Sequence, residues 1–157
     1  MGKKKRKLYC AYGSNLCVEQ MVQRCPTAKV TGAGTVDGYR LKFRGGYGSA
    51  VATIEATNKE AKIPVLVWLI TEKDEEALDR YEGWPHLYRK EDIIVTMDSG
   101  EPLEVMAYIM NPRYSENAPS VYYYNIIRDG YETAGFDTEF LRAAATRSAN
   151  RRVKEAE

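Results

Sequence analysis

Two short segments of the chain combine residue types that can bind or activate a small molecule. The first is "YGSN", Tyr12 to Asn15, a small polar turn between an aromatic segment and a helical pattern. Gly, Ser and Asn favour turns for conformational reasons alone, so the segment could simply reverse the chain. Such a turn can also direct backbone N–H groups at a carboxylate or phosphate. That second interpretation requires a chemical partner elsewhere in the sequence.

The second segment contains Glu82, the acid with the most informative surroundings. It directly precedes Gly83 at the predicted end of a helix, where the helix dipole disfavours an ionised acid by about 0.3 to 1 kcal/mol and raises its pKa. Apolar neighbours could raise the pKa further by desolvation. The alternative is an ordinary surface glutamate, since perturbed carboxylates mark functional sites only probabilistically. The neighbours in question are Trp84, Pro85, Leu87 and Tyr88.

Other reactive residue types are scarce. His86 is the only histidine, which excludes a histidine-rich metal site and leaves any Ser-His-Asp or Cys-His arrangement dependent on this one residue. Cys10, Cys17 and Cys25 are odd in number and lack the paired spacing of a zinc site or redox dithiol. We therefore expect buried, reduced thiols, a cytoplasmic protein, no metal and no cofactor, with any catalysis resting on carboxylates, hydroxyls and backbone.

Length and composition indicate a single globular domain. The chain has 157 residues, of which 44% are hydrophobic and 29% charged. The longest apolar run, "IPVLVWLI" from Ile63, is far shorter than the roughly 20 residues that span a bilayer, so no membrane association is expected. The net charge of +1 favours neither nucleic acid nor membrane.

The basic start, "MGKKKRK", is expected to be a flexible solvated tail over residues 1–7, followed by one domain over residues 8–157. An alternative is that this tail tethers the domain to an acidic partner. No aromatic residue is interleaved with its charges, which disfavours a nucleic-acid contact.

The elements that must position these residues follow from hydrophobic periodicity. Aromatic and β-branched runs predict strands at 8–12, 29–36, 39–44, 50–56, 63–70, 88–97 and 103–110. Helical patterns cover 18–25, 72–82, 121–135 and 138–148. Strands do not alternate regularly with helices, and "GAGTVDG" lacks the third glycine of the dinucleotide fingerprint. We predict an α+β domain, a small mixed β-barrel or sheet with flanking helices.

Two features of the predicted helices matter for a site. Thr71 can cap the start of the 72–82 helix and Gly83 can close its end, which fixes Glu82 in the last turn. In the run Tyr122, Tyr123, Tyr124, one or two rings should pack into the core while the others face solvent. A hydroxyl from this run could reach a site.

The segments "LYCAYGSNL", "LDRYEG" and "APSVYYYNII", in this order, resemble the gamma-glutamyl cyclotransferase family. The segments "VATIEA" and "AYIMN" add to the resemblance, which extends from about Leu8 to Arg147. It implies a small barrel-like fold in which one glutamate serves as acid and base, and a small-molecule γ-glutamyl substrate with no nucleic-acid or membrane partner.

The same resemblance implies roles for particular residues. Glu82 corresponds to the catalytic acid and base, and Tyr123 to the tyrosine of the Pro-Ser-x-x-Tyr element. Tyr88 corresponds to a tyrosine a few residues after the glutamate, although "GWPHL" differs in length from this segment in relatives. The loop that cradles the γ-glutamyl group corresponds to Tyr9, Cys10, Ala11, Tyr12, Gly13, Ser14 and Asn15.

The implied reaction is a cofactor-free cyclisation, in which the substrate's α-amine attacks its own γ-carbonyl to give 5-oxoproline and a free amine or amino acid. An α-amine of pKa ~8 and an unperturbed glutamate of pKa ~4.3 differ by about 3.7 pKa units, or roughly 5 kcal/mol for proton transfer. Glu82 therefore needs a raised pKa to act as the base. The alternative function is a non-catalytic module that binds a carboxylated γ-glutamyl-type metabolite.

Overall fold

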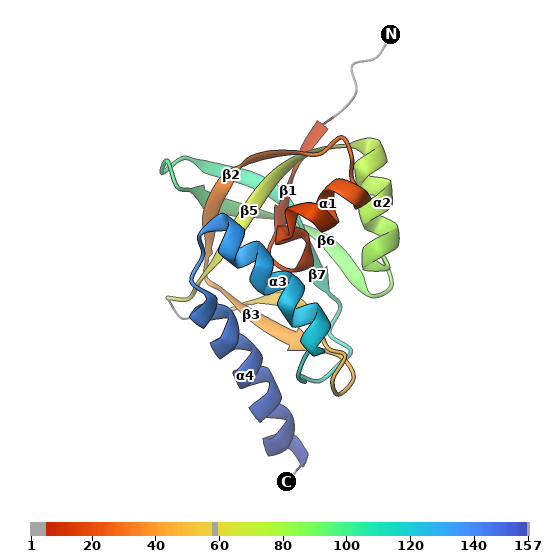
Figure 1. Cartoon of the computed structure of the whole chain (residues 1–157), viewed down its shortest axis with the longest axis vertical. Helices are drawn as coiled ribbons and strands as arrows, with labels where there is room; N and C mark the ends of the chain where they lie inside the picture. The colour runs from red at the N-terminus through yellow and green to blue at the C-terminus, as the bar shows by residue number, and fades with distance from the viewer. Residues whose placement is uncertain (1–5, 58–59, 157) are drawn as a thin grey trace.

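The computed structural model describes residues 6–57 and 60–156, and its centre is a closed five-stranded barrel (Figure 1). The strand order around the barrel is β1-β5-β2-β6-β7. Closure pairs every strand on both sides and leaves no open edge. The five strands are β1 (Arg6–Ala11), β2 (Lys29–Asp37), β5 (Lys62–Thr71), β6 (Tyr88–Met97) and β7 (Pro102–Met110).

The barrel closes through β1. This strand pairs antiparallel with β5 along its whole length and meets β7 in parallel at Tyr9 and Met106. On the other side of β5, β2 pairs antiparallel and then continues to β6. The apolar run of β5 is buried, as expected for a strand with neighbours on both sides. Because β1 is paired on both sides, the barrel fixes the position of the turn that directly follows it.

A separate two-stranded ribbon lies beside the barrel. It consists of β3 (Tyr39–Arg44) and β4 (Val51–Ala56), paired antiparallel. The Thr53 hydroxyl accepts a hydrogen bond of 3.0 Å from the Met110 N–H, which ties β4 to the end of β7. The ribbon therefore brings residues near position 52 next to the barrel strands.

Within the described residues, four α-helices and one short 3₁₀ turn pack around these strands (Figure 1). The 3₁₀ turn η1 follows β1 directly, α2 follows β5, α3 packs against η1, and α4 packs against β3. The bounds are η1 (Ser14–Leu16), α1 (Val18–Arg24), α2 (Glu72–Glu82), α3 (Val121–Ala134) and α4 (Thr138–Ala156).

Local signals fix both ends of α2. The Thr71 hydroxyl accepts from the Asp74 N–H at 3.2 Å, and the Asp74 carboxylate accepts from the Thr71 N–H at 3.1 Å, which completes a capping box. Gly83 ends the helix with φ 67°, a left-handed conformation that costs glycine little. The expected position of Glu82 as the last helical residue is confirmed.

The α+β fold with a small barrel is confirmed, while two details differ from expectation. Strand β1 begins at Arg6, so Arg6 and Lys7, expected in the basic tail, pair with β5, and the Lys7 ammonium lies 3.1 Å from the Glu75 carboxylate. Residues 1–5 of that tail lie outside the described residues.

In the sequence, Val18, Met21, Val22 and Cys25 recur at helical spacing on one face, but the buried face of α1 is narrower than this pattern. Met21 and Cys25 are buried, whereas Val18 and Val22 are 37% and 55% exposed. Only one narrow stripe of this short helix contacts its neighbours, so the flanking valines remain in water. Among the described helices, none has both the length and the apolarity needed to cross a membrane.

The packing of α3 against η1 depends on Gly130. A Cβ atom at this position would lie 2.6 Å from the carbonyl carbon of Leu16 and 2.9 Å from the nitrogen of Cys17. Both neighbours are backbone atoms, so helix and turn would have to separate.

We therefore predict that Gly130→Ala lowers the free energy of unfolding by about 1 to 3 kcal/mol, although alanine is the better helix former. Urea unfolding of the variant beside Asp129→Ala, an exposed neighbour in α3, tests this. A Gly130→Ala protein as stable as the Asp129→Ala control would contradict the close approach.

Candidate active site

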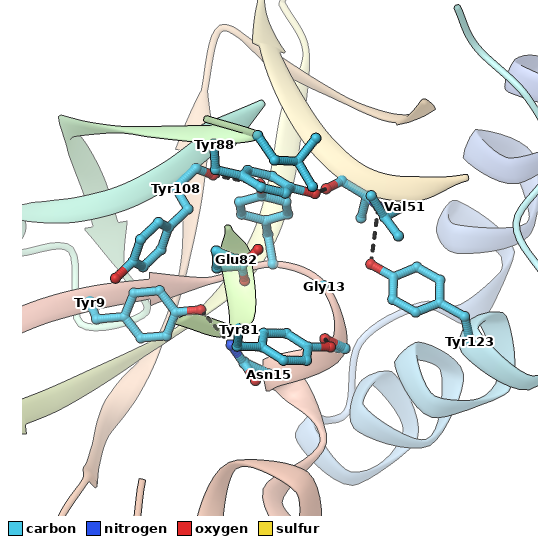
Figure 2. A pocket seen from close by; sticks show the side chains of 13 residues that line it. Tyr9, Gly13, Asn15, Val51, Tyr81, Glu82, Tyr88, Tyr108 and Tyr123 are labelled. Carbon is cyan, nitrogen blue, oxygen red and sulfur yellow. Dashed lines mark hydrogen bonds between the residues drawn. The ribbon is translucent and has the colours of Figure 1, made fainter. Parts of the chain in front are cut away.

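A cavity of about 240 Å³ lies where the barrel, η1, the β3–β4 ribbon and α3 meet (Figure 2). Six of its thirteen lining residues are tyrosines, and Glu82 is the one acid among the described residues that line it. The lining residues are Tyr9, Tyr12, Gly13, Ser14, Asn15, Val51, Ala52, Tyr81, Glu82, Leu87, Tyr88, Tyr108 and Tyr123.

Glu82 enters this cavity from the C-terminal end of α2. Its neighbours Tyr81 and Gly83 are exposed and the residue as a whole is partly exposed, but its side chain points inward between the tyrosine rings (Figure 2). Burial of the carboxyl group raises the pKa of Glu82 to about 7, and the positive charge of Arg24 opposes that rise. No described residue donates a hydrogen bond to this carboxylate. Glu82 can therefore both accept and release a proton near neutral pH.

The surrounding tyrosines remain protonated. Burial raises the pKa of Tyr9, Tyr12 and Tyr88 well above the ordinary value for tyrosine, and the nearby Glu82 carboxylate raises each of them further. The pKa of Tyr123 rises for the same two reasons, despite the N–H of Ala52 that bonds its oxygen. At neutral pH these phenols can donate hydrogen bonds and cannot act as bases.

The turn after β1 leaves backbone donors unused beside the cavity. The Leu16 N–H donates to the Gly13 carbonyl at 3.0 Å, and the Cys17 N–H to the Ser14 carbonyl at 3.1 Å. Among the described residues, no acceptor lies within bonding distance of the N–H groups of Gly13, Ser14 and Asn15. All three residues line the cavity. The turn can therefore receive an oxygen atom that carries negative charge.

Side chains hold the turn in place from both flanks. The Asn15 amide donates to the Tyr9 hydroxyl at 2.8 Å, and the Ser14 and Tyr81 hydroxyls are 2.8 Å apart. Arg24, at the end of α1, donates to the Asn15 side-chain carbonyl and stacks 3.5 Å from the centre of the Tyr81 ring. Arg24 thus connects the turn to α2, whose last residue is Glu82.

Tyr88 and Tyr123 hold β4 against the cavity. The Tyr88 hydroxyl donates to the Ala52 carbonyl at 2.6 Å, and the Ala52 N–H donates to the Tyr123 hydroxyl at 3.0 Å (Figure 2). Gly13 lies next to this contact: a Cβ there would lie 3.3 Å from Ala52 Cβ, a tight approach, and 3.6 Å from the Tyr123 hydroxyl. The Tyr123 hydroxyl keeps its own proton free to donate into the cavity.

The remaining wall is fixed by a charged network. Tyr108 donates to the Asp79 carboxylate at 2.6 Å, and the Lys90 ammonium lies 2.9 Å from Asp79 and 2.7 Å from Glu75. Lys90 also lies 4.1 Å from the centre of the Trp84 ring. The network holds the Tyr108 ring against Tyr9, with centroids 5.9 Å apart.

Most residues that the sequence indicated for the site come together here: Tyr9, Tyr12, Gly13, Ser14, Asn15, Glu82, Tyr88 and Tyr123. Cys10 and Ala11, expected in the loop that contacts substrate, do not line the cavity. Cys10 faces the opposite side of β1 from Tyr9, because successive strand residues alternate, and the short Ala11 side chain is buried in the core.

Several wall residues were not indicated by the sequence: Arg24 beside the cavity, and Val51, Ala52, Tyr81 and Tyr108 in its lining. Tyr81 and Tyr108 lie within the quoted segments "LDRYEG" and "AYIMN", which were the available signal. Of the four neighbours expected to desolvate Glu82, Leu87 and Tyr88 line the cavity with it, whereas Trp84 and Pro85 are exposed; tyrosines from other elements complete the desolvation.

No three acidic, histidine or cysteine side chains in the described part of the chain are placed to hold a metal ion. His86 is exposed. Cys10, Cys17 and Cys25 are unpaired thiols, of which Cys10 and Cys25 are buried.

Comparison with known proteins identifies similar chains. The model of the family described as "Gamma-glutamyl cyclotransferase, AIG2-like" matches residues 9–126. Human gamma-glutamylcyclotransferase is 27% identical over 141 residues, covering 85% of this chain and 74% of that protein. The bovine protein of the same name is 28% identical over 144 residues, covering 86% and 75%. A solved structure of gamma-glutamyl cyclotransferase shares the fold, with a TM-score of 0.80 at 24% identity, covering 89% of this chain and 86% of that one.

The raised pKa of Glu82 predicts a stability cost that grows with pH. A folded-state pKa of about 7 exceeds the ordinary value of 4.5, so the unfolded chain releases this proton first and stability falls as pH rises between these values. Glu82→Gln removes the titration and should make the protein more stable than wild type at pH 8, by up to about 3 kcal/mol, with little difference at pH 4.

Urea unfolding at the two pH values measures this difference. Glu76→Gln, the same substitution at an exposed position of α2, is the control and should show no such pH dependence. An equal effect of both substitutions at pH 8 would mean that the Glu82 carboxylate is well solvated.

Proposed function

The chain belongs to the gamma-glutamyl cyclotransferase, AIG2-like family, and we propose that it is a cyclotransferase that converts a γ-glutamyl compound into 5-oxoproline and a free amine or amino acid. One observation carries the proposal: a glutamate with a pKa of about 7 lines a small cavity opposite a turn with unused N–H groups. The names of the human and bovine relatives support the same activity.

In the proposed reaction the α-nitrogen of the substrate forms a bond to its own γ-carbonyl carbon, and the bond from that carbon to the leaving nitrogen breaks. The attacking nitrogen loses two protons as it changes from an ammonium to a lactam. The leaving nitrogen gains two as it departs as an ammonium. Glu82 accepts protons from the first nitrogen and delivers them to the second, so it ends ionised, as it began.

The tetrahedral intermediate places negative charge on the former carbonyl oxygen. We assign its stabilisation to the turn at Gly13, Ser14 and Asn15, whose N–H groups have no acceptor among the described residues. The Tyr123 hydroxyl, which accepts from Ala52 and retains a proton to donate, lies next to Gly13 and can contribute a further hydrogen bond. The reaction is intramolecular, so the cavity chiefly has to hold the substrate in its cyclising conformation.

The position of the Glu82 pKa makes the first proton transfer feasible. An α-ammonium of pKa ~8 and a carboxylate of pKa about 7 differ by about one pKa unit, which corresponds to about 1.4 kcal/mol. The same transfer to an unperturbed glutamate would cost roughly 5 kcal/mol. Burial of Glu82 therefore removes most of this barrier at the expense of stability.

The alternative, a module that binds a γ-glutamyl-type metabolite without turnover, uses the same turn and cavity. A binding module would not need a titratable carboxylate at Glu82, because a buried amide would be more stable there at neutral pH. We also propose a reducing, cytoplasmic setting, which the three unpaired thiols support.

We predict that Glu82→Gln lowers 5-oxoproline release by about 10²- to 10⁴-fold while substrate binding persists. Purified wild-type protein is assayed against γ-glutamyl amino acids and γ-glutamylamines, which also assigns the preferred leaving group. The Glu76→Gln control should retain wild-type turnover. Wild-type binding without release from any member of this panel would favour the binding module.

The pH profile tests the position of Arg24. Because its charge lowers the Glu82 pKa, Arg24→Gln should move the acid limb of kcat/KM above its wild-type position near pH 7, so that activity falls several-fold more at pH 6.5 than at pH 8.5. Arg24→Lys keeps the charge and should leave the limb near its original position. An unshifted limb in Arg24→Gln would contradict this electrostatic role.

A further inference from the structure

A second hollow lies away from the tyrosine-lined cavity, on the outer face of the β3–β4 ribbon beside α4. Its volume is about 450 Å³, and it shares no lining residue with the cavity around Glu82. Seven described residues line it, all of them polar or charged: Arg40, Lys42, Arg44, Glu116, Arg147, Asn150 and Arg151. We call this hollow the basic groove.

Two rows of cations face the basic groove. Arg40, Lys42 and Arg44 are alternate residues of β3 and therefore lie on one face of the strand. Arg147 and Arg151 are four residues apart on α4 and therefore lie on one face of the helix. Rigid elements thus hold five cationic side chains around one hollow.

Nearby acids neutralise only part of this charge. The Glu55 carboxylate lies 3.1 Å from Lys42 and 2.5 Å from Arg44. The Glu116 carboxylate lies 3.9 Å from Arg151 and accepts from the Ser148 hydroxyl at 3.2 Å. Glu55 and Glu116 therefore pair with three of the five cations.

The remaining positive charge of the groove lies on Arg40 and Arg147. In the part of the chain that the structure describes, no carboxylate lies within ion-pairing distance of either side chain. Partial burial lowers the pKa of Arg147, the nearby charge of Arg40 lowers it further, and Glu116 opposes both effects more weakly. Like charges held together destabilise a protein, and an anion between them would relieve the repulsion.

We propose that the basic groove binds a polyvalent phosphate anion, a chain of two or more phosphoryl groups. Guanidinium groups match phosphate oxygens through paired N–H donors, and the groove offers four of them. The cations extend about 13 Å along β3 and about 6 Å along α4, which exceeds the reach of one phosphate. No aromatic side chain lines the groove, so it lacks the stacking surface with which proteins bind single-stranded nucleic acid.

Calorimetric titration of the full chain with inorganic tripolyphosphate tests this, at about 0.15 M salt to screen non-specific attraction. Wild type should bind saturably, and Arg40→Gln combined with Arg147→Gln should weaken binding at least tenfold. Arg142→Gln, on the same helix but paired with Glu139 outside the groove, should bind as wild type does. Absence of saturable binding to wild type, or equal binding by the double variant, would overturn the proposal.

Titrations with two further ligands identify the source of the phosphate. If adenosine triphosphate binds as tightly as tripolyphosphate, the groove recognises the phosphate chain alone. If adenosine triphosphate binds more tightly, the groove recognises a nucleotide. Both results support the proposal. Binding of a single-stranded RNA oligomer with no binding of either small anion would overturn it. Should the double variant fail to fold, Arg40→Gln and Arg147→Gln are titrated separately, and each should weaken binding several-fold; unchanged binding in both would overturn the proposal.

Discussion

Desolvation of the Glu82 carboxylate is the constraint on which the arrangement around the cavity depends. An ionised carboxylate is most stable in water, and removing it from water raises its pKa unless other charges compensate. The last turn of α2 carries Glu82 toward the barrel, where tyrosines from β1, β6, β7 and α3 replace the solvent. These rings desolvate the carboxyl group while their hydroxyls remain protonated. The Tyr88 and Tyr108 protons are donated to Ala52 and Asp79, whereas the Tyr9 and Tyr123 hydroxyls accept hydrogen bonds and keep a proton to donate.

The wall around Glu82 holds together because its polar groups bond one another rather than the glutamate. The backbone of Ala52 bonds Tyr88 on one side and Tyr123 on the other, which joins the β3–β4 ribbon, the barrel and α3 at one residue. Asn15 bonds Tyr9 and Arg24, while Tyr108 bonds Asp79. The glutamate is left without a donor among the described residues, so its proton stays available for exchange.

Arg24 and Glu82 show how the fold balances stability against reactivity. A cation in direct contact would hold Glu82 ionised with a low pKa and make it a poor base. Arg24 instead stacks on Tyr81 and bonds Asn15, so it lowers the Glu82 pKa without overcoming desolvation. The result is a titration near neutral pH, maintained at a cost to folding stability at higher pH.

The sequence by itself determined the local elements and the chemical candidates. Periodicity located the strands and helices, and Thr71 and Gly83 fixed the ends of α2. The ordered segments around "YGSN", Glu82 and Tyr123 indicated the family. The sequence contains these signals because each of them acts over only a few residues. Tertiary structure decided which side chains meet. It placed Cys10 and Ala11 outside the cavity lining and brought Arg24, Tyr81 and Tyr108 to the site. It also surrounded Glu82 with tyrosines from several elements, while Trp84 and Pro85 remained exposed. Barrel closure and strand alternation set those contacts, and they join residues far apart in the chain, beyond the reach of any local pattern.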